Sequence, residues 1–113
     1  VRVAELTGEP LCLLGRGFCT RRIIEDCFDR AGTPPTVVVE MNSVEGVMAV
    51  VEAGGPATIL LALGTGGRSL ACVRIERPTP KRTVSLLQLK GHAPLRARTT
   101  FIELVRATLL RAT

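Results

Sequence analysis

The sequence predicts an α/β fold in which a mostly parallel central sheet is flanked by helices, and three observations predict it. Apolar runs of strand length alternate with segments of helical periodicity along the 113 residues, which is typical of parallel strands joined by right-handed helical crossovers. Hydrophobic residues make up 46% of the chain, enough for a packed core. Because the chain has three Phe and no Tyr or Trp, aliphatic side chains must fill that core.

The first four elements are bounded by residues that break regular structure. An apolar run follows Pro10, and the helical pattern that begins at Thr20 ends at Gly32, before two prolines. A β-branched run comes next, and its continuity predicts a strand covered on both faces. A second helical pattern ends at Gly54. The predicted elements are strands at 11–14, 36–41, 57–63, 70–75 and 82–90, and helices at 20–31, 44–53 and near the C-terminus.

The start of the last helix is open between two signals. Residues Thr100 and Glu103 match a capping box, whereas Pro94 suits the first turn of a longer helix. The apolar face of this helix comprises Phe101, Leu104, Val105 and Leu109.

Ligands of an open parallel sheet bind beyond the carboxyl ends of its strands, where the helices begin. In this sequence those places are residues 15–20, 41–44 and 61–67. The first has the Gly-x-Gly start of a dinucleotide-binding loop, and Glu40 ends the next strand as the ribose-binding acid would. Thr20 stands where that loop requires a third glycine. This difference favours a plain strand-to-helix turn, whose helix start suits a small anion.

Catalytic and metal-binding motifs are absent from the sequence. The four cysteines form no Cys-x-x-Cys pair, and the single histidine, His92, is distant from them in sequence, so neither a metal nor another cofactor is expected. No Gly-x-Ser-x-Gly motif occurs, and no base has a spacing that would activate a cysteine nucleophile. The chain is therefore not expected to be an enzyme. The cysteines are expected to be reduced thiols of a cytoplasmic protein, with Cys12 and Cys72 inside strands.

The basic residues predict no surface for reading DNA. The net charge is +5, but the Lys and Arg residues are scattered along the chain without aromatic side chains beside them, which indicates a solvated surface. No run of 18 apolar residues exists, so no membrane span is expected. Because the sequence starts at Val1 without an initiator Met or a signal segment, we expect a piece of a longer protein.

Several segments together resemble the effector-binding region of LysR-type transcriptional regulators. The resemblance covers residues 10–110 and rests on the order and spacing of the segments. Within that family, the sequence looks most like the subgroup that includes the cyanate-operon regulator. The segments are Pro10 to Leu14, Arg22 to Gly32 with Pro35, Glu40 to Ser43, Val50 to Gly54, and the stretch from Arg82–Val84 through Phe101–Leu104.

The resemblance implies the fold of the type 2 periplasmic binding proteins, in which two α/β lobes hold an effector in the cleft between them. This chain would be the second lobe over residues 10–80, followed over 81–113 by the strand and helix that return to the first lobe. A small, anionic metabolite would bind in the cleft and shift the arrangement of subunits on DNA. The parent protein would be a homo-oligomer that contacts DNA only through its missing N-terminal domain, and it would have no membrane partner.

The resemblance and the geometry of parallel sheets indicate the same effector-facing positions. Asn42 and Ser43 also have a second, compatible role as the N-cap of the helix that follows them. The expected effector-binding residues are Gly17, Phe18, Cys19, Thr20, Asn42, Ser43, Leu61 and Ala62.

Two positions near the third strand depart from the family pattern. The family usually has Gly-x-Gly before this strand and a proline at its end, but here Pro56 replaces the second glycine and Leu61 occupies the position of the proline. Two other functions stay open from the sequence. One is a substrate-binding module of the periplasmic transport type, which requires an export signal upstream, and the other is a nucleotide-binding enzyme fragment built on residues 15–20.

Overall fold

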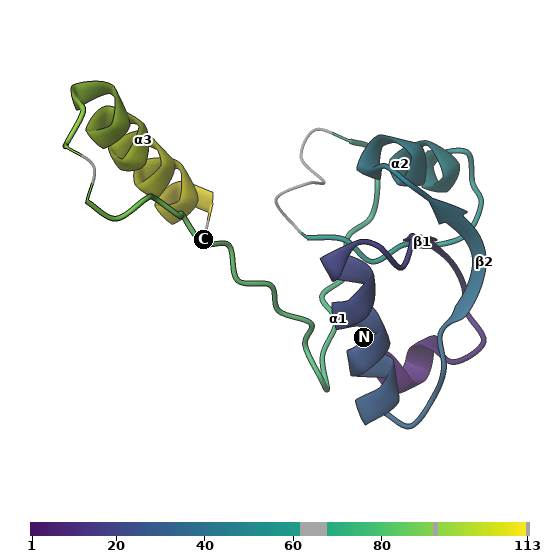
Figure 1. Cartoon of the computed structure of the whole chain (residues 1–113). Coiled ribbons are helices and arrows are strands. Elements are labelled where there is room, and N and C mark those ends of the chain that lie inside the picture. Colours follow the sequence, from purple (N-terminus) through teal and green to yellow (C-terminus); the bar gives the residue numbers. More distant parts are fainter. Residues whose placement is uncertain (62–67, 92, 113) are drawn as a thin grey trace. The chain divides into compact units, whose positions relative to one another are not determined.

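The computed structural model of the chain describes residues 1–61, 68–91 and 93–112 (Figure 1). Its contacts divide the chain into two units, Val1–Thr83 and Val84–Thr113. The elements of the first unit are the 3-10 helix η1 (Val3–Leu6), strand β1 (Pro10–Leu14), helix α1 (Cys19–Arg30), strand β2 (Thr36–Met41) and helix α2 (Val44–Glu52). The second unit contains helix α3 (Arg96–Ala112).

Strand β1 lies at the centre of the first unit. It pairs in parallel with β2, and its other side meets the chain at Ala57, where the Cys12 amide donates to the Ala57 carbonyl at 2.8 Å. Helices α1 and η1 cover one face of β1 and α2 covers the other. Because β1 is enclosed by both neighbours and both helical layers, its residues from Leu11 to Leu14 are all buried. This arrangement confirms the α/β class with parallel strands and flanking helices.

A β-bulge in β2 determines which of its side chains pack on each face of the sheet. The register runs from Leu11 opposite Val37 to Cys12 opposite Val39, which leaves Val38 as the extra residue of a β-bulge. Val37 therefore packs with the α1 side of the sheet and Val39 with the α2 side. Val38 is 55% exposed. Side chains of β2 thus pack on both faces, as expected, but none of them is buried, because β2 is the outer strand of the pair and alternates between exposed and half-buried residues.

The predicted helix boundaries follow from local chemistry. After α1, Gly32 has a φ of +74°, a left-handed conformation that glycine adopts without a steric penalty. At the start of α2, the Ser43 hydroxyl accepts a hydrogen bond from the Gly46 amide at 3.0 Å, as a serine N-cap does. A side chain at Gly46 would meet the end of Met41, so this glycine allows α2 to approach the end of β2.

Three predicted strands do not form as continuous strands among the described residues. The strand expected at 57–63 reduces to a single bridge between Ala57 and Leu11, and its last two residues lie outside the described part of the chain. Residues 70–75 and 82–90 have no strand assignment. The physical reason is that a strand needs a neighbouring strand for its hydrogen bonds. The patterns of these segments indicate apolar character but cannot indicate whether a partner is present.

The beginning of the first unit is held by the segment around Glu76. The Val3 amide donates to the Glu76 carbonyl at 3.0 Å, and the Glu76 amide donates to the Val1 carbonyl at 2.8 Å. Arg2 and Glu76 thus form a parallel bridge. Val3 is buried in the core beneath α1, so this pairing connects two distant parts of the chain to one core.

In the second unit, α3 begins at Arg96, two residues after Pro94. This start lies between the two predicted ones and nearer the longer helix, and Pro94 precedes the helix instead of lying in its first turn. Most of the large apolar side chains of this unit, among them Leu87, Leu89, Phe101 and Leu104, are exposed. The predicted boundary between residues 80 and 81 stays a prediction. None of the helices in the described residues combines the length and apolar character needed to cross a membrane.

Candidate functional site

The loop between β1 and α1 lies at the carboxyl edge of the sheet, as the sequence predicts. The Gly15 amide donates to the Met41 carbonyl at 3.0 Å, so the loop starts beside the last residue of β2. Gly17 is exposed in the turn, Phe18 is the N-cap of α1, and Cys19 is the first residue of the helix. A side chain at Gly17 would meet nothing within 4 Å. The structure therefore leaves open space beside this glycine.

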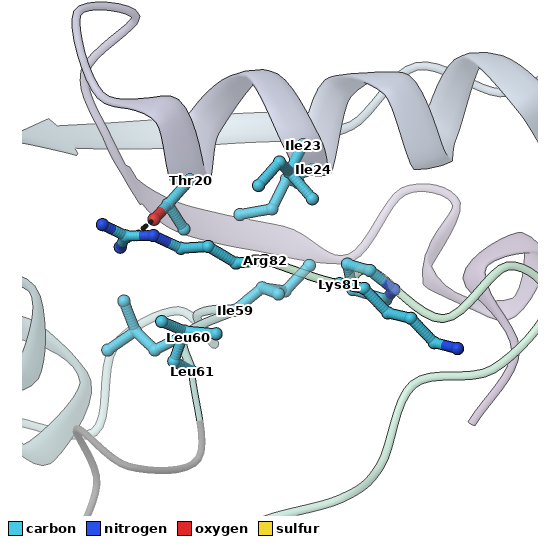
Figure 2. A pocket seen from close by; sticks show the side chains of 9 residues that line it. Thr20, Ile23, Ile24, Ile59, Leu60, Leu61, Lys81 and Arg82 are labelled. Atoms are coloured by element: carbon cyan, nitrogen blue, oxygen red, sulfur yellow. Dashed lines mark hydrogen bonds between the residues drawn. The ribbon is translucent and has the colours of Figure 1, made fainter. Parts of the chain in front are cut away.

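A small pocket opens next to this loop, between the first turns of α1 and the segment that follows Ala57. Its volume is about 40 Å³, and residues 80–82 form its third side (Figure 2). Of the predicted site residues, Thr20 and Leu61 line it. Ala62 lies outside the described residues. The lining residues are Thr20, Ile23, Ile24, Ile59, Leu60, Leu61, Pro80, Lys81 and Arg82.

Of the two cations that line this pocket, Lys81 and Arg82, Arg82 is the one that contacts α1. Its side chain lies between α1 and residues 59–61 (Figure 2), and its Nη1 donates to the Thr20 hydroxyl at 3.4 Å. The Lys81 side chain points in a different direction, away from Thr20 (Figure 2). Sequence reasoning treated Arg82 as one of many scattered basic residues. The contact with Thr20 joins residues 62 positions apart, and no local pattern indicates it.

Arg21 forms a second charged cluster at the same edge of the sheet. It is 2% exposed, its Nη1 donates to the Leu14 carbonyl at 3.0 Å, and its Nε donates to Glu25 at 2.9 Å. Glu40 lies 3.6 Å from the same guanidinium. The expectation of a solvated surface charge is wrong for Arg21. The signal in the sequence was its spacing, because Arg21, Ile24 and Phe28 share one helical face at i, i+3 and i+7.

Asn42 and Ser43 lie at the start of α2 and do not line the pocket. Both are exposed, and the Ser43 hydroxyl oxygen already caps the helix. A further cation, Arg68, lies beside α2 and forms ion pairs with two of its carboxylates. The Arg68 guanidinium is 2.7 Å from Glu52 and 3.2 Å from Glu45. These two carboxylates raise the pKa of Arg68, the Glu52 hydrogen bond most strongly. The predicted residues that the structure describes therefore form two groups, one at the start of α1 together with Leu61 and the other at the start of α2.

The cysteines divide into a buried and an exposed pair, and all four are free thiols. Burial raises the pKa of Cys12 and of Cys27, which disfavours their reactive thiolate forms. Cys19 and Cys72 are exposed. The expectation that Cys72 is buried in a strand is wrong, because its segment forms no strand. In the described part of the chain, no cluster of three or more His, Cys, Asp or Glu side chains is arranged to hold a metal ion.

The comparison with known families agrees with this geometry. Residues 1–110 match the LysR substrate binding domain. The chain therefore belongs to the LysR substrate-binding family, whose fold is that of the periplasmic binding proteins. No solved structure matches the chain significantly.

Curated relatives of the chain are bacterial transcription regulators. The DNA-binding transcriptional dual regulator OxyR of Escherichia coli (strain K12) is 34% identical over 106 residues, which cover 87% of this chain and 33% of the relative. The Hydrogen peroxide-inducible genes activator of Escherichia coli O6:H1 has the same identity and coverage. The Uncharacterized HTH-type transcriptional regulator YybE of Bacillus subtilis (strain 168) is 25% identical over 92 residues, or 80% of this chain and 32% of the relative. The chain thus spans about a third of the length of these relatives.

Proposed function

We propose that this chain senses a small effector on behalf of a LysR-type transcriptional regulator. The observation that carries the proposal is the match of residues 1–110 to the substrate binding domain of this family. Binding would act without chemistry, by favouring one of two arrangements of the parent protein on DNA. The parent would contact DNA through a separate domain and act as a homo-oligomer. Residues 10–80 would form the effector-binding lobe, and residues 81–113 would return to the other lobe.

The proposed effector-binding residues are those at the carboxyl edge of the sheet. They comprise Gly17 to Thr20 before and within the first turn of α1, Asn42 and Ser43 before α2, and Leu61 with Ala62 after Ala57. Two features support an anionic effector. Both α1 and α2 begin at this edge, and helix N-termini favour negative charge by about 0.3 to 1 kcal/mol. Arg82 adds a full positive charge beside Thr20.

The alternatives have less support. The relatives that match the chain are regulators rather than transport proteins or enzymes, so we propose a non-catalytic role in the cytoplasm. The nucleotide-binding alternative also has Thr20 where the dinucleotide-binding loop has its third glycine. Membership of the cyanate-operon regulator subgroup stays a prediction.

Substitutions at Ser43 test the proposal in the full-length regulator. Ser, Asp and Asn cap helices about equally well, so Ser43→Asn and Ser43→Asp both preserve α2. Only Ser43→Asp adds a negative charge at the proposed site. We expect Ser43→Asp to weaken effector-dependent transcription from a reporter at least tenfold, which corresponds to about 1.4 kcal/mol, and to leave operator binding unchanged.

Two variants serve as matched controls. Ser43→Asn changes the same side chain without adding a charge, and the exposed Ser69→Ala lies outside the proposed site and should respond like the wild type. Asn42→Ala should also reduce the response. A folded Asn42→Ala, Ser43→Asp double variant with normal effector sensitivity would contradict a site at the start of α2.

A response to hydrogen peroxide is a second candidate function. One relative is named a Hydrogen peroxide-inducible genes activator, and Cys19 presents an exposed thiol at the first position of α1. The thiolate sulfur would attack one peroxide oxygen and break the O–O bond. Uptake of a proton then gives a sulfenic acid and one molecule of water.

Mass spectrometry distinguishes this candidate from effector binding. Treatment with one equivalent of peroxide and a sulfenic-acid trap should label Cys19 and leave the buried Cys12 and Cys27 unlabelled. A disulfide between Cys19 and Cys27 requires α1 to unwind, because eight helical residues span about 12 Å and disulfide Cα atoms lie about 4.4–6.8 Å apart. Labelling of Cys19 at the same rate as the exposed Cys72 would argue against a dedicated peroxide sensor.

A further inference from the structure

We infer that the pocket beside α1 binds a short aliphatic monocarboxylate, with the carboxylate on Arg82 and the carbon tail among the apolar side chains of Ile23, Ile59 and Leu60. This inference rests on the proposed effector-sensing function and specifies its ligand. The pocket belongs entirely to the first unit of the chain.

The charge at the pocket selects an anion. Arg82 is the cation whose guanidinium lies beside the Thr20 hydroxyl (Figure 2), and a guanidinium binds a carboxylate through two parallel hydrogen bonds. The Thr20 hydroxyl already accepts from Arg82, so its own proton is available to a ligand oxygen. A carboxylate, with its two acceptor oxygens, satisfies both side chains.

The walls of the pocket select an apolar tail. Six of the nine lining residues are Ile, Leu or Pro, and they come from α1, from residues 59–61 and from Pro80. A second polar group on the ligand would lose its hydrogen bonds to water and find no partner on these apolar walls, which disfavours its binding. Dicarboxylates, sugars and polar amino acids are therefore poor candidates.

The size of the pocket suits a short tail. The volume of about 40 Å³ exceeds the roughly 10–15 Å³ that one water molecule needs, so a short carbon tail has room in it. Butanoate presents a three-carbon tail to the apolar walls, whereas acetate presents a single methyl group.

Ligand-observed NMR titrations of the 113-residue chain test the inference with butanoate, butanamide, acetate and succinate. Butanamide has the shape of butanoate without its charge. We expect saturable binding of butanoate, with at least tenfold weaker binding of the other three probes. Butanamide lacks the charge that pairs with Arg82, acetate lacks most of the apolar tail, and succinate would bring a second carboxylate against apolar walls. Equal affinities for butanoate and butanamide, or no butanoate binding, would overturn the inference.

Two substitutions of exposed arginines provide a matched comparison on the protein side. Arg82→Gln should weaken butanoate binding at least tenfold, whereas Arg22→Gln, outside the pocket lining, should change it less than twofold. Both side chains are exposed, so neither change disturbs the core, and unchanged far-ultraviolet circular dichroism verifies folding. Butanoate binding that survives Arg82→Gln would overturn the assignment of the anion to Arg82.

The failure of this inference is distinguishable from the failure of the proposed function. Suppose that the full-length Arg82→Gln regulator responds normally to its effector while Ser43→Asp does not. The function then stands and the pocket is not the effector site. If butanoate binds through Arg82 but no compound changes transcription, the pocket chemistry stands and the regulatory function falls.

Discussion

At the scale of single residues, Arg21 shows how one side chain connects three elements. Its guanidinium belongs to α1, hydrogen-bonds to the last carbonyl of β1 and lies beside Glu40 of β2. The group is buried, but its two carboxylate partners remain partly exposed. Water therefore weakens the ion pairs, and the hydrogen bond to the Leu14 carbonyl is the interaction that a substitution affects most.

Arg21→Met is expected to lower the free energy of unfolding by about 1–3 kcal/mol, because it leaves the Leu14 carbonyl without its partner. Urea denaturation followed by circular dichroism measures this change. Arg22→Met is the matched control, since Arg22 is an exposed neighbour, and it should change stability by less than about 0.5 kcal/mol. Equal effects of the two substitutions would show that Arg21 does not join α1 to the sheet.

The thiols give a second prediction at this scale. With limiting iodoacetamide at pH 7.5, Cys19 should be alkylated first and Cys72 second, because both are exposed and only Cys19 lies at a helix N-terminus. Burial raises the pKa of Cys12 and of Cys27. The reactive thiolate forms of these two cysteines are therefore less populated than those of unburied cysteines at the same pH. Peptide mass spectrometry over time gives the order, and rapid labelling of Cys12 in folded protein would contradict its buried position.

At the scale of elements, α2 depends on the chemistry of its first turn. The Ser43 hydroxyl caps the Gly46 amide, and Glu45 adds a negative charge near the helix N-terminus, where it is favourable. Ser43→Ala should lower the unfolding free energy by about 1 kcal/mol, whereas Ser43→Asp should be at least as stable as the wild type. Thermal denaturation of the three proteins tests this ranking, and a stable Ser43→Ala variant would show that the cap contributes little.

The elements that could be predicted are those whose signals are local. Gly32 and Ser43 terminate or start helices through their own backbone and side-chain chemistry, and the apolar run at residues 11–14 needs no distant information to indicate burial. The expected strand at 70–75 failed because pairing depends on a partner elsewhere in the chain. The same limit applies to the candidate site. The place of Thr20 at the edge of the sheet follows from sheet geometry, but its contact with Arg82 joins distant parts of the sequence and could not be predicted from a local pattern.

At the scale of the whole molecule, the dispersed positive charge gives a prediction for DNA. The net charge is +5, and the described basic residues include several that are already paired with carboxylates, such as Arg21 and Arg68. The chain should bind DNA weakly and without sequence preference. The affinity for DNA should fall steeply as the salt concentration rises from about 50 to about 200 mM, because the release of counterions from DNA supplies the binding energy. A gel shift with sequence-selective binding at physiological salt would contradict a purely sensory role.

The parallel bridge between Arg2 and Glu76 has a consequence for how the first unit folds. More than seventy residues separate these two positions, so the loop that the bridge closes is nearly as long as the unit itself. Contacts of such long range slow folding, because the chain loses entropy before it gains the contact. On a ribosome, β1, α1 and β2 can form as soon as they emerge, but Val3 has no backbone partner until Glu76 has been synthesised. The first residues of the unit are thus among the last to reach their final places.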